Sequence, residues 1–365
     1  MTTVHKIVHV ETGRHLYGGA QQVLYIVTGL AARGVDNWLV CTPDSAIAGA
    51  AAEAGVTVVE IPCRGDLDLR FTWRLRQMLA ATAPDIVHCH SRRGADVLGG
   101  QAAAMLGIPA VVSRRVDNPE SKLLSALRYR RFERVIAISD AIAGVLADAG
   151  LDARKIVVIR SAVDAAAFGA APERAVLAAE FGIGPEHFAI ACAAQLIPRK
   201  GQRYLLDAVA RLTAQRPGLR VVLFGQGAEE AALKARCQAL GLSDVVRFAG
   251  FRADLDRYLG AFDVLAHPAL AEGLGVITLK AQAAGVPVVA FAAGGLPEAV
   301  VHEQTGLLVP PADTVRLAEA LALLSDDRDL RDRYARAARE HAEASFSVDA
   351  MVTGHLRLYE AILND

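Results

Sequence analysis

The sequence predicts an α/β protein made of two doubly wound parallel-sheet domains. Short apolar strands alternate with longer amphipathic helices along nearly the whole chain. The strands are continuous apolar runs, which is typical of parallel strands that helices cover on both faces. At 365 residues the chain is also long for a single core. The alternation pauses at residues 161–172 and then restarts, so we expect a boundary between two domains there.

The expected strands fall into two sets on either side of this pause. Those of the first set cover residues 6–10, 38–41, 56–61, 86–89, 110–113, 135–138 and 156–159. Those of the second set cover residues 188–194, 220–224, 245–248, 264–266, 286–291 and 307–309. Helices are expected between most strands, as at 20–33 and 69–81, and the segment 313–363 is expected to be wholly helical. The predicted domains are 1–168 and 169–345, and residues 346–365 form a helix that packs back on the N-terminal domain.

Composition and charge exclude several classes of protein. Apolar residues make up 53% of the chain and charged residues 22%, which is typical of a globular protein with an ample core. No run reaches the roughly 18 apolar residues that span a bilayer, and the start lacks the layout of a signal peptide, so we expect a cytoplasmic protein. The net charge of −1 argues against non-specific binding of nucleic acid. The five cysteines are widely spaced, and we expect reduced, buried thiols.

Residues 263–298 form the most informative stretch of the chain. An apolar strand ends at His267, a short loop carries Glu272 and the glycines Gly273 and Gly275, and a helical run starts at Val276. The N-terminus of a helix offers unpaired N–H groups and the positive end of its dipole to an anion. Glycine lets a ligand approach the backbone closely. The stretch therefore predicts a site that holds a phosphate group with sugar hydroxyls beside it.

Three further loops connect a strand to a helix. Gly18 and Gly19 open a long helix, where an oxyanion or a sugar could rest, or where the glycines form only a flexible turn. Arg199 and Lys200 precede another helix; cations are disfavoured there unless an anion is present, so this loop is either a phosphate clamp or a solvated turn. A simple tight turn explains Gly225. None of these loops has the GxGxxG spacing of a dinucleotide site.

Two histidines and a basic segment complete the candidates. Alternation along the strand places His88 and His90 on one face, with His90 at the strand end, and we reject a metal site because no third ligand follows at useful spacing. Residues 114–134 hold seven Arg or Lys against three Asp or Glu. Within them, residues 122–132 form a basic amphipathic helix, which either lies on an anionic membrane or acidic acceptor or is an ordinary solvated surface helix. The basic side chains in question are Arg114, Arg115, Arg128, Arg130 and Arg131.

At this point the chain resembles the retaining glycosyltransferases of family 4, which have the two-domain GT-B fold. The resemblance runs nearly end to end, and the order and spacing of its motifs are more specific than any one of them. They read GGAQ, DIVHCHS, VIAISDAI, SAVD, RKG, LFGQGAEE, FAGF, FDVLAHPALAEGLG, AAGVPVVAF, GGLPE and TGLLVPP. The resemblance implies two Rossmann-like domains facing a central cleft and transfer of a sugar from a nucleotide-diphosphate sugar, with no metal ion and no protein nucleophile.

The resemblance also implies roles for individual residues. Glu272 matches the first glutamate of the family's Glu-x7-Glu motif, which contacts donor-sugar hydroxyls, and Lys200 matches the lysine that binds the diphosphate. His90 matches a histidine near the transferred sugar. We therefore expect Glu272, Lys200 and His90 to be the catalytic residues. The other expected donor-binding residues are Gly18, Gly19, Gln195, Arg199, Gly225, Phe251, Arg252, Gly273, Leu274, Gly275, Val276 and Lys280.

The chain departs from the family pattern at two of these positions. The second glutamate of the motif, which binds ribose hydroxyls in the family, is replaced by Lys280. Lysine only donates hydrogen bonds, so Lys280 could instead pair with a phosphate or an acidic donor sugar. Many members carry an arginine where this chain has Gln195, and Arg199 could supply that charge.

These observations together predict a retaining, metal-independent hexosyltransferase. Its expected donor is a UDP- or GDP-linked sugar, its acceptor is a glycan or lipid-linked intermediate of the cell envelope, such as a lipopolysaccharide or glycolipid, and it contacts the inner face of an anionic membrane peripherally. Two alternatives stay open: a sugar-nucleotide epimerase of the same fold, and a non-catalytic sugar-nucleotide-binding partner, which Lys280 suggests. Incubation of donor without acceptor distinguishes the epimerase, and donor binding without turnover distinguishes the partner.

Overall fold

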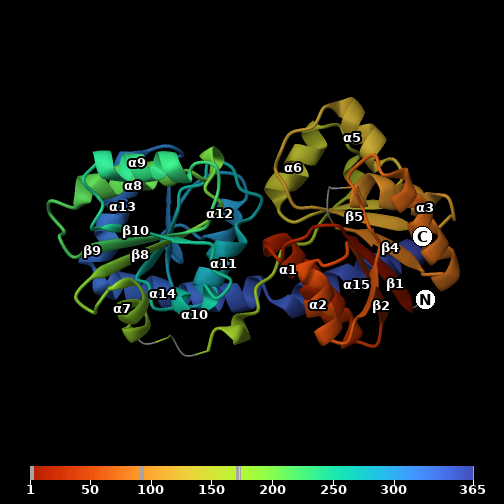
Figure 1. The fold of residues 1–365 in the computed structure, drawn as a ribbon, viewed down its shortest axis with the longest axis horizontal. Helices are drawn as coiled ribbons and strands as arrows, with labels where there is room; N and C mark the ends of the chain where they lie inside the picture. Colours follow the sequence, from red (N-terminus) through yellow and green to blue (C-terminus); the bar gives the residue numbers. More distant parts are fainter. Residues whose placement is uncertain (1–3, 91–93, 170–171, 173, 365) are drawn as a thin grey trace. The chain divides into compact units, whose positions relative to one another are not determined.

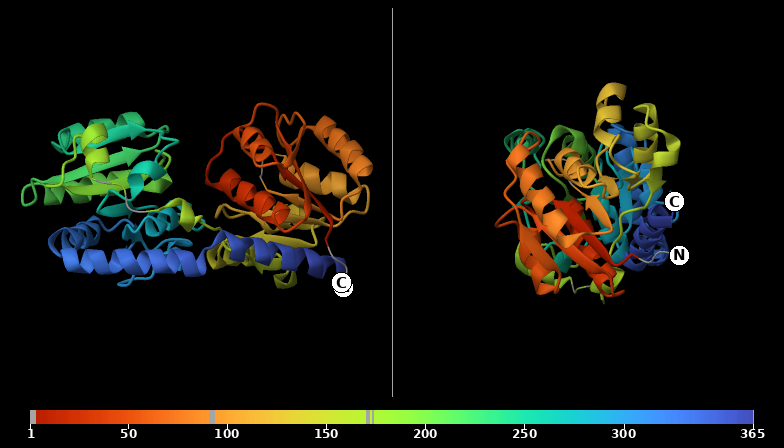
Figure 2. Two further views of the ribbon diagram at one scale, coloured as in Figure 1. Left: turned by 90° about the horizontal axis from the view of Figure 1, so that it is seen from below. Right: turned by 90° about the vertical axis from the view of Figure 1, so that its right-hand side faces the viewer.

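A computed structural model of the protein describes residues 4–90, 94–169, 172 and 174–364 (Figure 1). The chain forms two compact units. One consists of Met1–Ala162 together with Val348–Asp365, and the other of Val163–Ser347. Each unit has its own parallel sheet, and Figures 1 and 2 show helices on both faces of each sheet. This is the doubly wound arrangement that the apolar strands predicted, so the predicted fold class is confirmed.

The first unit contains a seven-stranded sheet with the order β3-β2-β1-β4-β5-β6-β7, in which all pairs are parallel. Its strands are β1 (Lys6–Glu11), β2 (Asp36–Cys41), β3 (Thr57–Glu60), β4 (Ile86–Cys89), β5 (Ala110–Arg114), β6 (Arg134–Ala137) and β7 (Ile156–Val158). Its helices are α1 (Gly18–Ala31), α2 (Ala46–Glu53), α3 (Leu69–Thr82), the π-helix η1 (Ala95–Gly99), α4 (Gly100–Ala104), α5 (Lys122–Tyr129), α6 (Asp140–Asp148), η2 (Ala153–Lys155) and α15 (Val348–Asn364).

The second unit contains a six-stranded sheet with the order β10-β9-β8-β11-β12-β13, also parallel throughout. Its strands are β8 (Phe188–Ala193), β9 (Leu219–Phe224), β10 (Val246–Gly250), β11 (Val264–His267), β12 (Val288–Phe291) and β13 (Gly306–Val309). Its helices are η3 (Ala165–Ala167), α7 (Ala175–Phe181), η4 (Pro198–Lys200), α8 (Gln202–Leu212), α9 (Glu230–Ala239), α10 (Asp256–Leu259), α11 (Val276–Ala283), α12 (Leu296–Ala299), α13 (Thr314–Asp326) and α14 (Arg328–Ser345).

The order of the strands decides where each unit can bind a ligand. In the first sheet the direction of winding reverses between β1 and β4, and in the second sheet it reverses between β8 and β11. In open parallel sheets, the loops that leave neighbouring strands at such a reversal diverge to opposite faces, and a crevice opens at the carboxyl ends of the two strands. The loops after β8 and β11 carry Lys200 and Glu272, so the fold brings these two predicted residues to one edge of the second sheet.

The segment 313–363, expected to be wholly helical, is divided into three helices. Asp313 caps α13, and Asp327 caps α14 by accepting a hydrogen bond from the N–H group of Leu330. The third helix, α15, belongs to the first unit although it follows the second unit in the chain. It buries Met351, Val352 and Tyr359 in the same core cluster as α1 residues such as Ile26. The apolar stripe at helical spacing is what holds α15 there.

Candidate functional site

Two loops of the second unit are joined at the carboxyl edge of its sheet. The N–H group of Leu270 donates to the carbonyl oxygen of Arg199 over 2.8 Å, and the Arg199 side chain donates to the carbonyl oxygen of Ala271 over 3.3 Å. Gly201 has φ +71°, and a Cβ atom there would lie 1.9 Å from the carbonyl oxygen of Pro268. Only glycine permits so close an approach. The loop after β8 is therefore held directly against the loop after β11.

Glu272 lies at the centre of this pair of loops. The Lys200 ammonium group forms an ion pair with its Oε2 atom. The Nε2 atom of His267, at the end of β11, lies 2.9 Å from the same oxygen. The side chains are mostly buried, with exposed fractions of 11% for Lys200, 15% for Glu272 and 1% for His267. The structure thus brings Lys200 and Glu272 into contact and adds His267, which the sequence pattern showed only as the last residue of a strand.

The surroundings keep the Glu272 carboxyl group ionised. Burial alone raises its pKa, but the hydrogen bond and charge of His267 and the charge of Lys200 outweigh burial, and the pKa lies well below its ordinary value. The Oε1 atom accepts a hydrogen bond of 3.2 Å from the N–H group of Gly273. An ionised carboxylate only accepts hydrogen bonds, so Glu272 is suited to receive hydroxyl groups of a ligand.

Glycines hold the backbone of Glu272 close to the start of α12. The N–H group of Gly295 donates to the Glu272 carbonyl oxygen over 2.9 Å. Gly294 has φ +55°, and a Cβ atom there would lie 2.2 Å from that same oxygen. Gly275 precedes α11 with φ +88° and no side chain caps this helix. Free N–H groups at the start of α11 are therefore available next to the carboxylate, as the predicted phosphate site requires.

The other predicted donor-binding residues of the second unit have partners of their own. The carbonyl oxygen of Gln195 accepts a hydrogen bond of 2.9 Å from the Gln202 side chain, and Phe251 is half exposed. Arg252 forms ion pairs with Asp254 and Glu180. Gly225 has φ +128°, and a Cβ atom there would lie 1.9 Å from the carbonyl oxygen of Ala194, so it permits a close packing of loops rather than only a tight turn.

Lys280, which replaces the second motif glutamate, lies on α11. Its ammonium group is 2.7 Å from the Oδ2 atom of Asp256 on α10. The ion pair is partly exposed, with exposed fractions of 24% and 47% for the two side chains. Lys280 is therefore engaged within the unit, and its role toward a donor stays a prediction.

Four histidines gather inside the first unit. His9, His88 and His90 bring ring nitrogens within 4.8 Å of one another, and all three are buried. The sequence argues against a metal site because no third ligand follows His88 and His90 at useful spacing, but β1 pairs with β4 and places His9 opposite His88, so a third histidine is in reach. The ring of His355, on α15, lies 5.6 Å from that of His88 between centroids. The pairing of β1 with β4 joins residues far apart in the sequence, so the spacing of histidines along the chain could not reveal the contact between His9 and His88.

The hydrogen bonds of this cluster have fixed directions. The Arg115 guanidinium group is 3.2 Å from His90 Nδ1, and because arginine only donates, that nitrogen accepts. His90 Nε2 then carries its proton and donates to His9 Nδ1 over 3.0 Å. His9 Nε2 in turn donates to Asn37 Oδ1 over 3.2 Å. Both ring nitrogens of His9 and of His90 are thus already used, so a metal ion would have to displace these bonds. The approach of His90 to a sugar stays a prediction.

The glycine loop of the first unit lies beside this network. Helix α1 begins at Gly18, and no acidic side chain lies in its first turn. A Cβ atom at Gly19 would lie 3.5 Å from the side chain of Arg115. The Arg115 side chain and the start of α1 are therefore neighbours, and a cation and a helix N-terminus both favour an anion.

The predicted basic surface of the first unit needs a correction. Arg114 is buried, with a side chain only 2% exposed, and it pairs with Glu120 over 2.9 Å. Arg128 pairs with Asp96 and Glu120, and its side chain is 19% exposed. Neither of these arginines can face a membrane, because each neutralises buried carboxylates inside the unit. Of the predicted basic residues, Arg130 is exposed and Arg131 half-buried.

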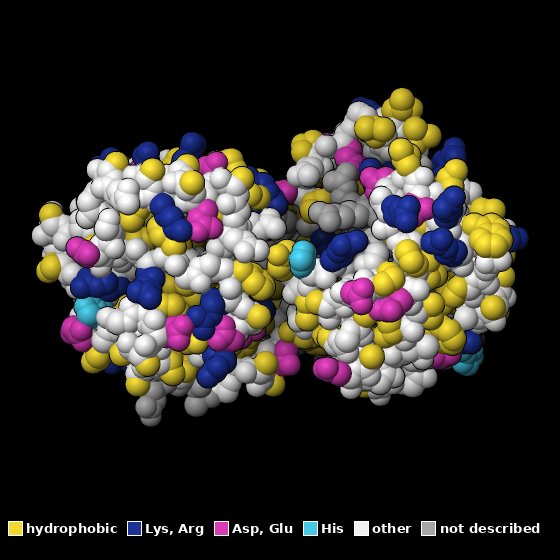
Figure 3. Space-filling model, viewed as in Figure 1, with side chains coloured by type: hydrophobic (Ala, Val, Ile, Leu, Met, Phe, Trp, Pro, Cys, Tyr) yellow, Lys and Arg dark blue, Asp and Glu magenta, His cyan; other side chains and the backbone are white. Residues whose placement is uncertain are grey.

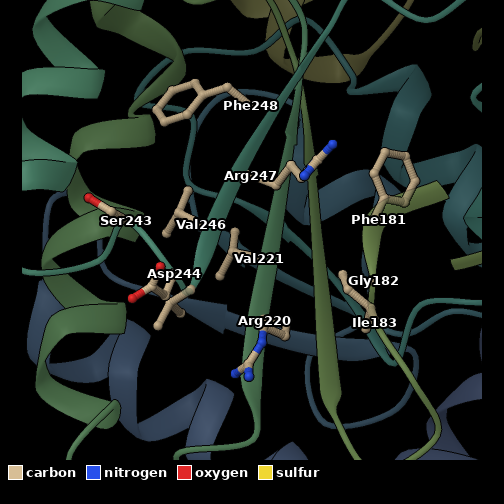
Figure 4. A pocket seen from close by; sticks show the side chains of 11 residues that line it. Phe181, Gly182, Ile183, Arg220, Val221, Ser243, Asp244, Val246, Arg247 and Phe248 are labelled. Atoms are coloured by element: carbon tan, nitrogen blue, oxygen red, sulfur yellow. The ribbon is translucent and has the colours of Figure 1, made fainter. Parts of the chain in front are cut away.

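Two cavities of the second unit lie away from this site. One, of about 490 Å³, is lined by Phe181, Arg220, Asp244, Arg247 and neighbouring residues (Figure 4). Another, of about 690 Å³, is lined by residues that include Arg174, His187 and Asp263. Both include residues at the amino ends of strands, the edge opposite Lys200 and Glu272. Neither is lined by a predicted site residue.

Comparison with known proteins agrees with this arrangement. Residues 174–341 match the family model of glycosyl transferases group 1, and residues 17–167 match that of glycosyltransferase family 4. A D-inositol 3-phosphate glycosyltransferase of Streptomyces scabiei is 32% identical over 325 residues, covering 81% of this chain and 72% of the relative. The lipopolysaccharide core biosynthesis glycosyltransferase LpsD of Rhizobium meliloti is 27% identical, covering 97% and 98%.

Other matches are partial or structural. A GDP-mannose-dependent monoacylated alpha-(1-6)-phosphatidylinositol monomannoside mannosyltransferase of Corynebacterium glutamicum is 40% identical over 171 residues, which is 44% of each chain, so the chain spans less than half of this relative. Anabaena HepE in complex with UDP and glucose has a TM-score of 0.87 at 24% identity, covering 98% of this chain and 100% of the other. A Rickettsia africae glycosyltransferase has a TM-score of 0.89 at 19% identity and covers both chains fully.

Two parallel Rossmann-like units, with a cationic and glycine-lined pair of loops at the carboxyl edge of the second, define an α/β protein of the GT-B fold. The chain belongs to the glycosyl transferases group 1, with an N-terminal part of family 4. Among the described residues, no helix combines the length and the apolar character needed to cross a membrane.

Proposed function

We propose that the protein transfers a sugar from a UDP- or GDP-linked donor to an acceptor hydroxyl with retention of anomeric configuration. The observation that carries the proposal is the contact between Lys200 and Glu272 at the carboxyl edge of the second sheet. A cation for a diphosphate and a carboxylate for sugar hydroxyls are thus adjacent, with the free N–H groups of α11 beside them. Relatives whose names include GDP-mannose, and a structure with bound UDP and glucose, support the donor class.

The proposed chemistry depends on charge that builds up on the leaving diphosphate. As the glycosidic bond breaks, Lys200, Arg199 and the amides after Gly275 stabilise the negative charge on the β-phosphate. Glu272 orients the sugar by accepting hydrogen bonds and does not attack it. The acceptor oxygen bonds to the anomeric carbon on the face that the diphosphate leaves, and the departing phosphate takes the acceptor proton, so no protein nucleophile is needed.

A panel of nucleotide sugars tests the donor. A ligand that binds only the folded protein raises its melting temperature, so the true donor shows the largest shift. Turnover is then measured with that donor, and the anomeric configuration of the product is read from its NMR coupling constants. An inverted product contradicts the retaining mechanism. An isomerised nucleotide sugar formed without acceptor identifies an epimerase instead.

We also propose that the acceptor is a lipid-linked glycan that the first unit meets at an anionic membrane. Helix α5 exposes Leu123, Leu124 and Leu127, with exposed fractions of 72%, 57% and 48%, and the exposed Lys122 and Arg130 flank them. Exposed leucines beside basic side chains are typical of a helix that lies in the headgroup region of a bilayer. Figure 3 shows hydrophobic side chains gathered over α5.

A second surface of the same kind surrounds the start of α3. Leu67, Leu69 and Trp73 are exposed by 92%, 75% and 58%, and the exposed Arg70 and Arg74 alternate with them. Figure 3 shows hydrophobic and basic side chains side by side over α3. Tryptophan and arginine are both favoured at a membrane interface. The exposed leucines and Trp73 around the start of α3, together with the exposed leucines of α5, supply the apolar area for contact with a bilayer.

Sedimentation with vesicles tests this part of the proposal. We expect the protein to sediment at low salt with vesicles that contain phosphatidylglycerol, and not with vesicles of phosphatidylcholine alone. The variant Leu69→Ser/Trp73→Ser should lose most of this binding, while Arg316→Ser, an exposed arginine of the second unit, should keep it. If the wild-type protein stays in the supernatant under both conditions, the membrane proposal is wrong and the donor proposal is unaffected.

A further inference from the structure

The Lys200–Glu272 ion pair poses a problem for a ligand that needs both residues. The carboxylate of Glu272 has about four positions at which it can accept a hydrogen bond. Oε2 accepts hydrogen bonds from Lys200 and His267, and Oε1 accepts one from the N–H group of Gly273. One position is therefore left for a sugar hydroxyl while Lys200 is in place. For the same reason, Lys200 is not free to meet a phosphate.

We infer that the Lys200–Glu272 ion pair is a latch that a complete sugar nucleotide opens and a nucleoside diphosphate alone opens poorly, with His267 as the fixed anchor of Glu272. This inference rests on the proposed function. A nucleoside diphosphate draws Lys200 away and leaves the mostly buried Glu272 without its cation, which is costly. A sugar nucleotide draws Lys200 to its diphosphate and at the same time offers sugar hydroxyls to the vacated Oε2 atom.

The neighbouring contacts allow Lys200 to move while Glu272 stays. Lys200 ends the short turn η4 and is followed by Gly201, so its long side chain alone has to swing. Glu272 is held by the bond from Gly295 to its backbone and by His267 and Gly273 at its side chain. His267 itself is 1% exposed and cannot follow Lys200. Its other ring nitrogen, Nδ1, is buried and has no hydrogen-bond partner among the described residues.

The arrangement decides which atom supplies the hydrogen in the bond between His267 and Glu272. The Nε2 atom faces a carboxylate oxygen, which only accepts, so Nε2 carries the hydrogen of this bond. His267 is therefore a positioning residue: it keeps one hydrogen bond on Oε2 before and after Lys200 leaves.

The latch has a consequence for the end of the reaction. Once the sugar has been transferred, the hydroxyl groups that occupied Glu272 leave with the product. Glu272 then competes with the diphosphate for Lys200, which favours release of the nucleoside diphosphate. The same ion pair thus distinguishes the donor from the leaving group, although both carry the same diphosphate.

Calorimetric titration of UDP and of GDP into matched variants tests the latch. We expect Glu272→Gln to bind the preferred diphosphate about tenfold more tightly than the wild-type protein, because the neutral amide no longer competes for Lys200. In a Lys200→Met background, Glu272→Gln should bring no gain. Equal or weaker binding by Glu272→Gln overturns the latch, since a glutamate that touches only the sugar would leave diphosphate affinity unchanged.

Variants of His267 test the anchor. We expect His267→Leu to lower kcat with the intact donor about tenfold and to leave diphosphate affinity within about twofold of wild type. His267→Gln, which keeps a donor toward Oε2, should restore most of kcat. A His267→Leu variant that binds the diphosphate more tightly, as Glu272→Gln should, contradicts the role as anchor. If the wild-type protein binds no UDP, GDP or nucleotide sugar, the proposed function fails first, and the latch with it.

Discussion

Acidification should destabilise the first unit through its buried histidines. Burial of His9 lowers its pKa from the ordinary 6.5 to about 4, although its hydrogen bond with Asn37 raises it somewhat. Burial lowers the pKa of His355 to about 3, and the pKa values of His88 and His90 also lie well below the ordinary value. The charge of Arg115 further disfavours protonation of His88 and His90.

The sign and size of the effect follow from linkage. In the window between pH 6.5 and 4, the unfolded chain binds a proton at His9 that the folded chain does not, so stability rises with pH and is lost on acidification. Between pH 7 and pH 5, these two pKa values correspond to a loss of about 2 kcal/mol from His9 alone. The comparison stops at pH 5 because carboxylates begin to titrate below that pH and would add their own effect. The other three histidines add to this loss, with coupling among them.

Urea unfolding followed by tryptophan fluorescence measures this effect in the first unit. The two tryptophans of the chain, Trp38 and Trp73, both belong to that unit. We expect the free energy of unfolding at pH 5 to be lower than at pH 7 by at least about 2 kcal/mol. His9→Gln should reduce the slope of the unfolding free energy against pH by the contribution of about one proton. An unchanged midpoint at the two pH values would refute the reasoning, and so would a His9→Gln variant with the wild-type slope.

Three further outcomes are expected. Lys200→Met should lower turnover with a saturating donor by about a hundredfold or more, because a fixed cation at the leaving group is lost; a fall below tenfold would contradict this role. Gly201→Ala should lower the free energy of unfolding by about 2 kcal/mol or more in denaturant titration, because its Cβ atom would lie 1.9 Å from the Pro268 carbonyl oxygen. Lys280→Glu should cost less than about 1 kcal/mol of stability, since its ion pair with Asp256 is partly exposed. The same variant in the nucleotide-sugar panel shows whether Lys280 selects the donor: an unchanged ranking would remove that role.

The sequence predicted the architecture well because the strands are short, continuous apolar runs. Each of the thirteen predicted strands is present, with ends shifted by at most two residues. The predicted division of the C-terminal helical segment lies between residues 345 and 346, and in the structure α14 ends at Ser345 and α15 begins at Val348. What divides them is a change of unit, which depends on where each apolar stripe is buried.

The candidate site was predictable only where its parts lie on loops with a recognisable pattern. Lys200 and Glu272 could be named from the sequence because both precede a helix at a strand-to-helix loop and because both match motif positions of the family that the chain resembles. Their contact with His267 could not, since a histidine at the end of an apolar strand gives no sign of its partner. In the same way, seven basic residues close together suggested one surface, yet Arg114 and Arg128 turn inward to carboxylates that only the folded chain brings near.

Helix α15 has a consequence for how the chain matures during synthesis. It completes the core of the first unit, and its Tyr359 hydroxyl lies 2.7 Å from His88 Nδ1, but it is translated only after the whole of the second unit. Until then the apolar face that α15 covers stays open on the nascent polypeptide. The second unit, which is one continuous segment, has all of its own residues before that moment. The first unit is therefore completed after the second, which reverses the usual order in which the N-terminal domain is finished first.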